Sequence, residues 1–234
     1  MTVRTASADR RLLRPTVIKL GGSLAESRRL AATLDIIAAA RVPVVIVPGG
    51  GGFADAVRCA QSDHGFSDAA AHHMALLAMH QTGLMLAALN ARLRPVETLA
   101  AMRSSLAARA IPVWLPAKLA LRDRRIPADW SVTSDGLAAR LAERLGRVPV
   151  VLVKSCRIPR GSTTATLVRE GIVDPTFKAI VERADLAWHV LGAGDDGALA
   201  GLVKARPAAV TVRKRSVREA CRRAPAARAI ARRR

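Results

Sequence analysis

The chain has 234 residues, half of them hydrophobic, and a formal net charge of +20 at pH 7. This length allows one large domain or two small ones, with enough apolar residues for a sizeable core. No apolar run is long enough to span a bilayer, which argues against a membrane protein. The first residues lack the apolar centre of a secretory signal, and an aromatic content of only 3% argues against an aromatic-rich β-sandwich.

The positive charge is concentrated at the C-terminal end. From Lys204 onward the sequence has twelve Lys or Arg residues and one acid, Glu219. Such a basic run is typical of a solvated segment, and the rest of the chain is only mildly basic. We therefore expect a flexible leader at residues 1–14, one folded domain at residues 15–205 and a basic, disordered tail at residues 206–234.

Strand and helix patterns alternate in the first half of the chain. Uninterrupted β-branched runs predict strands that are buried on both faces, as in a parallel sheet. Apolar residues at helical spacing, together with capping residues such as Ser23 and Ser67, predict the helices between them. The expected elements are strands at 16–20 and 44–47 and helices at 25–40, 53–61, 67–90 and 98–109.

The second half continues the alternation. Asp174 and Pro175 form a strong helix start, with Asp as the cap and Pro at the first helical position. The expected elements are a strand at 111–116, a helix at 137–145, a strand at 148–153, an irregular segment with room for a hairpin at 155–171, a strand at 186–191, a helix at 195–203 and a candidate last strand at 208–212. This order predicts an α/β fold with a mostly parallel sheet.

Two of the strands end in glycine-rich loops. Lys19 precedes Gly21 and Gly22, and the second strand runs into the four glycines 49–52. Glycines let backbone N–H groups approach an anion closely, and the following helix N-terminus adds positive potential. Neither loop has the spacing of a P-loop or of a dinucleotide-binding fingerprint. Two such loops at strand ends favour a phosphate site over simple tight turns.

Asp135 and Lys154 are further candidates. Asp135 follows Thr133 and Ser134 at a helix start, where capping alone would explain it. It could also hold Lys19 and Lys154 by ion pairing. Lys154 directly follows a strongly apolar strand, so it either points into a site or begins an exposed loop. Both alternatives stay open for each residue.

The chain resembles the amino acid kinase family over residues 16–205. The resemblance lies in Lys19-Leu20-Gly21-Gly22-Ser23, in Pro48-Gly49-Gly50-Gly51-Gly52-Phe53-Ala54-Asp55 and in Thr133-Ser134-Asp135. Within that family the chain is most similar to small kinases of methanofuran biosynthesis, which phosphorylate an aminomethylfuran-methyl phosphate to its diphosphate. The resemblance implies a three-layer αβα sandwich, ATP and Mg²⁺ as cofactors and a homo-oligomer. A location in the cytoplasm is expected from the scattered cysteines.

The resemblance also implies roles for individual residues. Lys19 and Asp135 are the expected catalytic pair, with Lys19 at the transferring phosphoryl group and Asp135 organising the lysines. The expected nucleotide-binding residues are Gly21, Gly22, Ser23 and Lys154. The expected acceptor-binding residues are Gly49, Gly50, Gly51 and Asp55. No metal-ligating residue is expected, and Lys178 is a weak match to a second catalytic lysine.

Several alternatives remain. The acceptor could instead be of the isopentenyl phosphate, uridylate or acetylglutamate type. The segment at 154–158 departs from the family's usual Lys-x-Val-Asp-Gly, which leaves open a non-catalytic nucleotide-binding relative. The basic tail could attract nucleic acid nonspecifically. His72, His73 and His80 are expected to be packing or surface residues, with one of them near the acceptor. The three scattered cysteines suggest reduced thiols.

Overall fold

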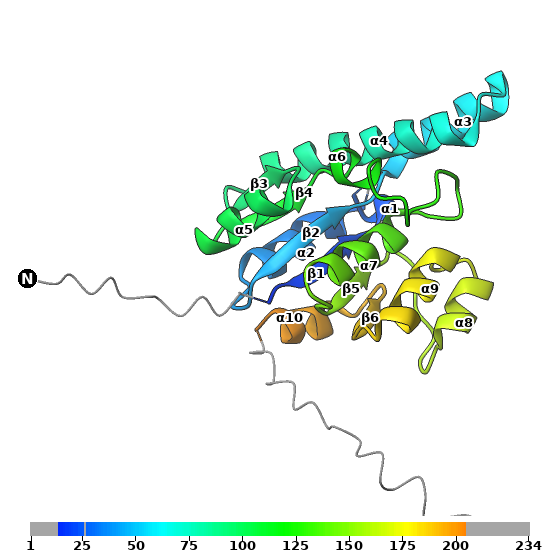
Figure 1. Cartoon of the computed structure of the whole chain (residues 1–234). Coiled ribbons are helices and arrows are strands. Elements are labelled where there is room, and N and C mark those ends of the chain that lie inside the picture. Colours follow the sequence, from blue (N-terminus) through cyan, green and yellow to red (C-terminus); the bar gives the residue numbers. More distant parts are fainter. Residues whose placement is uncertain (1–13, 26, 205–234) are drawn as a thin grey trace, which may run out of the picture.

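A six-stranded sheet forms the centre of the molecule (Figure 1). The structure is a computed structural model, and it describes residues 14–25 and 27–204. The strand order is β3-β4-β2-β1-β5-β6, and every neighbouring pair in the described chain is parallel. The strands are β1 (Thr16–Leu20), β2 (Val44–Pro48), β3 (Leu93–Val96), β4 (Ile111–Trp114), β5 (Val150–Val153) and β6 (Trp188–Leu191).

Helices connect the strands and cover the sheet. They are α1 (Gly22–Ala25), α2 (Arg29–Ala38), α3 (Gly51–His64), α4 (Asp68–Leu89), α5 (Leu99–Ala107), α6 (Ala117–Ala120), α7 (Ser134–Arg144), α8 (Thr164–Arg169), α9 (Pro175–Ala184) and α10 (Asp196–Lys204). Helices α3 and α4 pack side by side along one edge of the molecule, at the top of Figure 1. The predicted α/β class and three-layer αβα architecture are confirmed.

The central strands are buried on both faces, as their β-branched runs predict. All five residues of β2 and all four of β5 are buried. Side chains alternate between the two faces of a strand, so Val17 belongs to one core layer and Ile18 to the other. The first layer is closed mainly by α5, α7 and α9, and the second by α1, α2 and α10.

The register brings the ends of three strands to one place. Leu20 at the end of β1 pairs with Pro48 of β2 and with Val153 of β5. The three segments that follow these strands are the first glycine loop, the second glycine loop and the segment beginning with Lys154. In parallel sheets ligands bind beyond the carboxyl ends of the strands. All three candidate segments therefore start at the same edge.

The first helical segment differs from expectation. The predicted helix at 25–40 is divided into α1 and α2, with a turn at Ser27. The predicted capping role of Ser23 is wrong, because α1 already begins at Gly22 and the Ser23 hydroxyl contacts Ser155 instead. An early helix start places the Ser23 side chain over the segment after β5, where it finds a hydroxyl partner.

Two further elements were not predicted correctly. The hairpin suggested within 155–171 is wrong, since the segment contains α8, whose cap Thr163 accepts a hydrogen bond from the Thr166 amide. Strand β3 was missed because Arg94 and Pro95 interrupt its apolar pattern. β3 lies at the sheet edge and pairs only with β4 among the described strands, a position that tolerates proline.

Some predictions fall on residues outside the described ranges. These are the leader up to residue 13, the strand at 208–212, the basic tail and Cys221. The boundaries of the folded domain therefore stay predictions. Within the described part, no helix is long and apolar enough to cross a membrane.

Candidate active site

Two lysines share one aspartate at the carboxyl edge of the sheet. Lys19 Nζ lies 2.9 Å from Asp135 Oδ1, and Lys154 Nζ lies 2.5 Å from Asp135 Oδ2. Lys19 comes from β1, Lys154 directly follows β5 and Asp135 begins α7, so three separate elements bring these groups together. The structure thus supports ion pairing over simple capping for Asp135, and it places Lys154 within the cluster.

Asp135 is charged although it is buried. Its side chain is only 3% exposed. Burial by itself raises the pKa of this carboxyl, but the positive charges of Lys19 and Lys154 outweigh that effect and hold the pKa below its usual value. One carboxylate between two lysines leaves the cluster with an excess positive charge, which suits an anionic ligand.

Lys154 gives up its proton more readily than an ordinary lysine. Burial lowers its pKa, and the positive charge of Lys19 lowers it further, against the opposing effect of Asp135. Its side chain is 14% exposed and lines two neighbouring cavities. A lysine in this position can reach a ligand in either cavity.

Asp174 holds the backbone that carries Asp135. Its Oδ2 accepts hydrogen bonds from the amides of Thr133 and Gly136, at 2.8 and 2.9 Å, and from the Thr133 hydroxyl at 2.7 Å. Its Oδ1 accepts from the Phe177 amide at 2.6 Å and caps α9. Burial and the nearby charge of Asp135 raise the pKa of Asp174. The sequence predicted the cap, but it gave no signal for the contacts with the start of α7.

The two glycine loops touch each other through their backbones. A Cβ atom on Gly22 would lie 2.4 Å from the Gly51 nitrogen, and one on Gly49 would lie 2.3 Å from the Gly22 nitrogen. Gly51 also has a φ of 55°, which favours glycine. These glycines are needed because the loops pack closer than any side chain allows.

The glycines divide into two groups. The amide of Gly21 donates to Val153 O at 2.9 Å, and that of Gly49 donates to Leu20 O at 2.8 Å, so both close the loops onto the strands. This use of the Gly21 amide differs from the expected contact with a nucleotide phosphate. Gly22, Gly50 and Gly51 line the cavity and remain candidates for ligand contacts.

A cavity of about 530 Å³ contains most of the predicted residues. A second cavity of about 440 Å³ adjoins it, and both are lined by Ser23 and Lys154. Of the ten predicted site residues, the larger cavity is lined by Lys19, Gly22, Ser23, Gly50, Gly51, Asp55, Asp135 and Lys154. The structure thus offers two neighbouring compartments that share Ser23 and Lys154.

A pair of hydroxyls lies between the two compartments. Ser23 Oγ is 2.7 Å from Ser155 Oγ, which links the first glycine loop to the segment after β5. Cys156 and Arg157 also line the second cavity. Ser155 was not predicted as a site residue, because only the fold brings it to Ser23.

The larger cavity is also lined by a group that the sequence did not reveal. The guanidinium of Arg58 lies over the ring of Trp130, 4.1 Å from its centroid, and Arg58 Nη1 is 3.1 Å from Asp55 Oδ1. Trp130 Nε1 donates to Gln61 Oε1 at 2.6 Å. Arg58 and Gln61 are three residues apart on α3 and therefore share a face.

The histidines of α4 have separate roles. His72 is buried and lines the larger cavity, and burial lowers its pKa. His80 Nε2 accepts a hydrogen bond from the Ala117 amide at 3.0 Å, and burial lowers its pKa as well. His73 is exposed. The expectation that one histidine lies near the site while the others pack or face solvent agrees with this arrangement.

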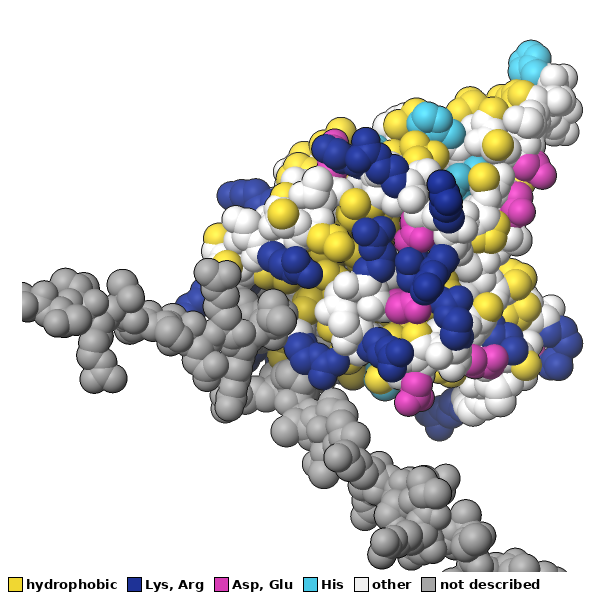
Figure 2. All heavy atoms as spheres, viewed as in Figure 1, with side chains coloured by type: hydrophobic (Ala, Val, Ile, Leu, Met, Phe, Trp, Pro, Cys, Tyr) yellow, Lys and Arg dark blue, Asp and Glu magenta, His cyan; other side chains and the backbone are white. Residues whose placement is uncertain are grey.

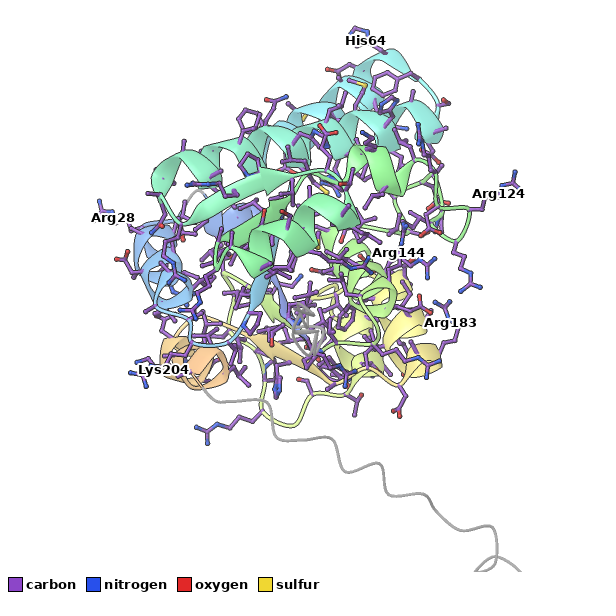
Figure 3. The ribbon with its side chains drawn as sticks, turned by 60° about the vertical axis from the view of Figure 1, so that its left-hand side comes forward. Arg28, His64, Arg124, Arg144, Arg183 and Lys204 are labelled. Atoms are coloured by element: carbon purple, nitrogen blue, oxygen red, sulfur yellow. The ribbon has the colours of Figure 1, made fainter. Side chains whose placement is uncertain are left out.

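Other charged groups lie away from the cavity. Lys178 pairs with Glu182 on α9 at 2.8 Å and does not line the cavity. Figure 3 shows Arg144 and Arg183 on the side formed by α7 and α9, while Arg124 points away from the body. Figure 2 shows Lys and Arg side chains spread over one face and interspersed with acids. Within residues 14–25 and 27–204, no cluster of three His, Cys, Asp or Glu side chains could hold a metal ion.

Comparisons with known proteins show which family and fold the chain shares. The sequence model of the amino acid kinase family matches residues 14–156. The (5-(aminomethyl)furan-3-yl)methyl phosphate kinase of Methanocaldococcus jannaschii is 27% identical over an alignment of 187 residues, and the match covers 75% of this chain and 86% of that protein. The uridylate kinase of Archaeoglobus fulgidus has a TM-score of 0.57 and 18% identity, covering 81% of this chain and 95% of its own.

Proposed function

Because the chain belongs to the amino acid kinase family of small-molecule kinases, we propose that it transfers the terminal phosphoryl group of ATP to a small anionic acceptor. The acceptor that we favour is an aminomethylfuran-methyl phosphate, which would become a diphosphate in the biosynthesis of a methanofuran-type one-carbon cofactor. The similarity to the M. jannaschii enzyme supports this choice.

The observation that carries the proposal is the Lys19–Asp135–Lys154 cluster beside two touching glycine loops. Phosphoryl transfer needs the two substrates in line and positive charge around the transferring group, with little acid–base chemistry. Two lysines at 2.9 and 2.5 Å from one carboxylate are held in fixed positions before any ligand binds. Such preorganised charge stabilises charge that develops in the transition state.

The two compartments suggest how the substrates divide the site. We assign the smaller cavity, with Ser23, Ser155 and Lys154, to the nucleotide, and the larger one, with Gly50, Gly51 and Asp55, to the acceptor. Helix α3 begins at Gly51, and the positive potential of a helix N-terminus suits an anionic acceptor there. Lys154 lines both compartments, and Lys19 lines the larger one and shares Asp135 with Lys154, so we place the passing phosphoryl group beside these two lysines.

Mg²⁺ would enter with the nucleotide. Both oxygens of Asp135 are already paired with lysines, and the described residues include no cluster of three metal ligands. Mg²⁺ in kinases is held largely by substrate phosphates and water, so this donor set suits an ion that is bound to ATP. When bound, the ion supplies further positive charge at the phosphates.

An acceptor panel tests the proposal. The full chain is incubated with Mg²⁺, ATP and one of four acceptors: aminomethylfuran-methyl phosphate, isopentenyl phosphate, uridylate or acetylglutamate. We expect ADP formation to be fastest with the furan phosphate and to be abolished by Lys19→Ala. Faster turnover of another acceptor would move the assignment to that acceptor. Unchanged turnover in Lys19→Ala would overturn the catalytic site.

A non-catalytic nucleotide-binding relative is the second candidate. The segment after β5 carries Cys156 and Arg157 in the cavity that we assign to the nucleotide, where the family usually has Val and Asp. Calorimetric titration with ATP separates the two possibilities. Binding of ATP without ADP formation from any acceptor would favour the non-catalytic protein.

We further propose a homo-oligomer. After Asp68, helix α4 has no charged residue, and its exposed face carries Met74, Leu77, Leu84 and Leu89. Basic surfaces on two copies of the chain repel each other. The uncharged apolar face of α4 is therefore the surface best suited to contact between two copies. We expect Leu84→Lys to lower the molar mass measured by light scattering; an unchanged mass would argue against this face.

The basic tail and the location complete the proposal. We propose that residues 206–234 attract nucleic acid nonspecifically, so DNA retention should weaken steeply with salt and vanish when they are removed, while kinase turnover persists. Retention that survives the truncation would contradict this role. ATP as donor and the free thiols of Cys59 and Cys156 support a cytoplasmic location.

A further inference from the structure

A side-chain cation occupies the outer part of the larger cavity. The Arg58 guanidinium is held between two groups, the Asp55 carboxylate at 3.1 Å and the face of the Trp130 ring at 4.1 Å. All three residues line the cavity. A carboxylate beside an aromatic face is the arrangement that binds ammonium and guanidinium ions. The protein therefore contains a cation site that one of its own residues fills.

The ring of Trp130 is fixed independently of Arg58. Its Nε1 donates to Gln61 Oε1 at 2.6 Å. Gln61 in turn donates through Nε2 to Asp68 Oδ1 at 2.8 Å and to the Phe66 carbonyl at 3.2 Å. The aromatic wall would therefore keep its place if the guanidinium moved away.

The guanidinium itself is held weakly. The Arg58 side chain is 48% exposed and that of Asp55 is 70% exposed. Exposed ion pairs contribute little, and within the described chain Asp55 is the only hydrogen-bond partner of this guanidinium. A flexible arginine side chain can thus be exchanged for a ligand cation at small cost.

The cation site lies at a defined distance from the reacting groups. Helix α3 begins at Gly51 beside the first glycine loop, and Asp55 follows four residues later, about 6 Å along the helix axis. Lys19 lines the same cavity. An acceptor phosphate at Gly51 and Lys19 would therefore present the opposite end of a small molecule to Asp55 and Trp130.

We propose that Asp55 and Trp130 bind an ammonium group of the acceptor, and that Arg58 occupies this place only until the acceptor arrives. The acceptor class is then a phosphate that carries an amine at its other end. This inference rests on the proposed function and narrows it, because isopentenyl phosphate and uridylate carry no such cation.

The test measures binding of two matched phosphates to the full chain by calorimetry. The probes are aminomethylfuran-methyl phosphate and its analogue in which a methyl group replaces the aminomethyl group. We expect the amine to bind about tenfold more tightly than the analogue. In Asp55→Asn this ratio should fall to about one, and in Trp130→Leu it should fall several-fold.

Two further variants sharpen the test. Asp63→Asn makes the same chemical change on the same helix, at an exposed position outside the cavity, and should keep the wild-type ratio. Arg58→Gln removes the competing cation, so binding of the amine should become tighter or stay equal. Circular dichroism checks that each variant is folded.

The possible outcomes separate the two proposals. Equal binding of both phosphates, no binding of either, an unchanged ratio in Asp55→Asn, or a tenfold loss of amine binding in Arg58→Gln would each overturn the cation site. Preferential binding of the amine without ADP formation would leave the cation site standing and refute the kinase assignment. ADP formation at equal efficiency from both phosphates would support the kinase assignment and refute the cation site.

Discussion

Gly22 and Gly49 meet backbone to backbone at the centre of the site. A Cβ atom on Gly49 would lie 2.3 Å from the Gly22 nitrogen and 2.8 Å from its Cα. Real Cβ atoms essentially never approach backbone atoms so closely. The contact joins the loop after β1 to the loop after β2, and it therefore fixes the two loops relative to each other.

Gly49→Ala should separate the two loops. Backbone atoms cannot move aside as a flexible side chain can, so we expect a loss of about 2–3 kcal/mol in the free energy of unfolding, with loss of turnover. Urea denaturation measures the stability. Gly201→Ala is the matched control, because a Cβ there meets nothing within 4 Å and alanine favours the helix. Equal effects of the two changes would refute this role of Gly49.

Asp135→Asn should destabilise the protein and abolish turnover. Lys19 and Lys154 would lose their shared counter-charge while buried, and breaking a buried ion pair costs about 3–5 kcal/mol. Glu182→Gln breaks a lysine pair on the surface of α9 and should change the unfolding midpoint little. An Asp135→Asn protein as stable as the wild type would show that the cluster is not held by this charge.

Turnover should fall at alkaline pH because of Lys154. Its pKa lies below the ordinary 10.5, so the positive charge is lost at a lower pH than in a free lysine. A pH–rate profile should therefore show an alkaline limb below pH 10.5. Lys154→Arg keeps its charge and should move the limb upward, whereas Lys178→Arg should not.

The same shift can be observed without turnover. NMR of the protein with ¹³C-labelled lysine should show a side-chain signal that titrates below pH 10.5 and disappears in Lys154→Arg. A limb at the same pH in the wild type and in Lys154→Arg would exclude Lys154 as its source.

Ser155→Ala should affect the nucleotide more than the acceptor. The change removes the partner of Ser23 in the smaller cavity, 2.7 Å away, and leaves the larger one intact. We expect a several-fold rise in KM for ATP, consistent with loss of one hydrogen bond, and little change in KM for the acceptor. Ser162→Ala, whose hydroxyl bonds only a nearby carbonyl, is the control. A larger effect on the acceptor would reverse our assignment of the two cavities.

Much of the candidate site was predictable because it depends on short, local patterns. Lys19 and the two glycine loops lie at the ends of β-branched strands, which are recognisable in the sequence. Parallel strands bring these ends to one edge of the sheet. Asp135 and Lys154 each had two explanations in the sequence. Only the distances within the cluster decided between them.

The outer part of the site was not predictable for a physical reason. Trp130 and Gln61 are 69 positions apart, and Thr133 and Asp174 are 41 apart. Their contacts depend on how helices and long loops pack, which no local periodicity encodes. Strand β3 was missed for another reason. Arg94 and Pro95 interrupt its apolar sequence, so it lacks the uninterrupted apolar run by which a buried strand is recognised.

The shared contacts of Asp174 have a consequence for the order of folding. One carboxylate caps α9 and also binds the amides of Thr133 and Gly136, so the first turn of α7 is completed by a residue 38 positions later. The entropy cost of closing such a long loop arises before these hydrogen bonds can form and offset it. We expect Asp135 to reach its final position only after α9 has docked. A nascent chain that lacks α9 would thus lack the assembled Lys19–Asp135–Lys154 cluster, even with its two glycine loops complete.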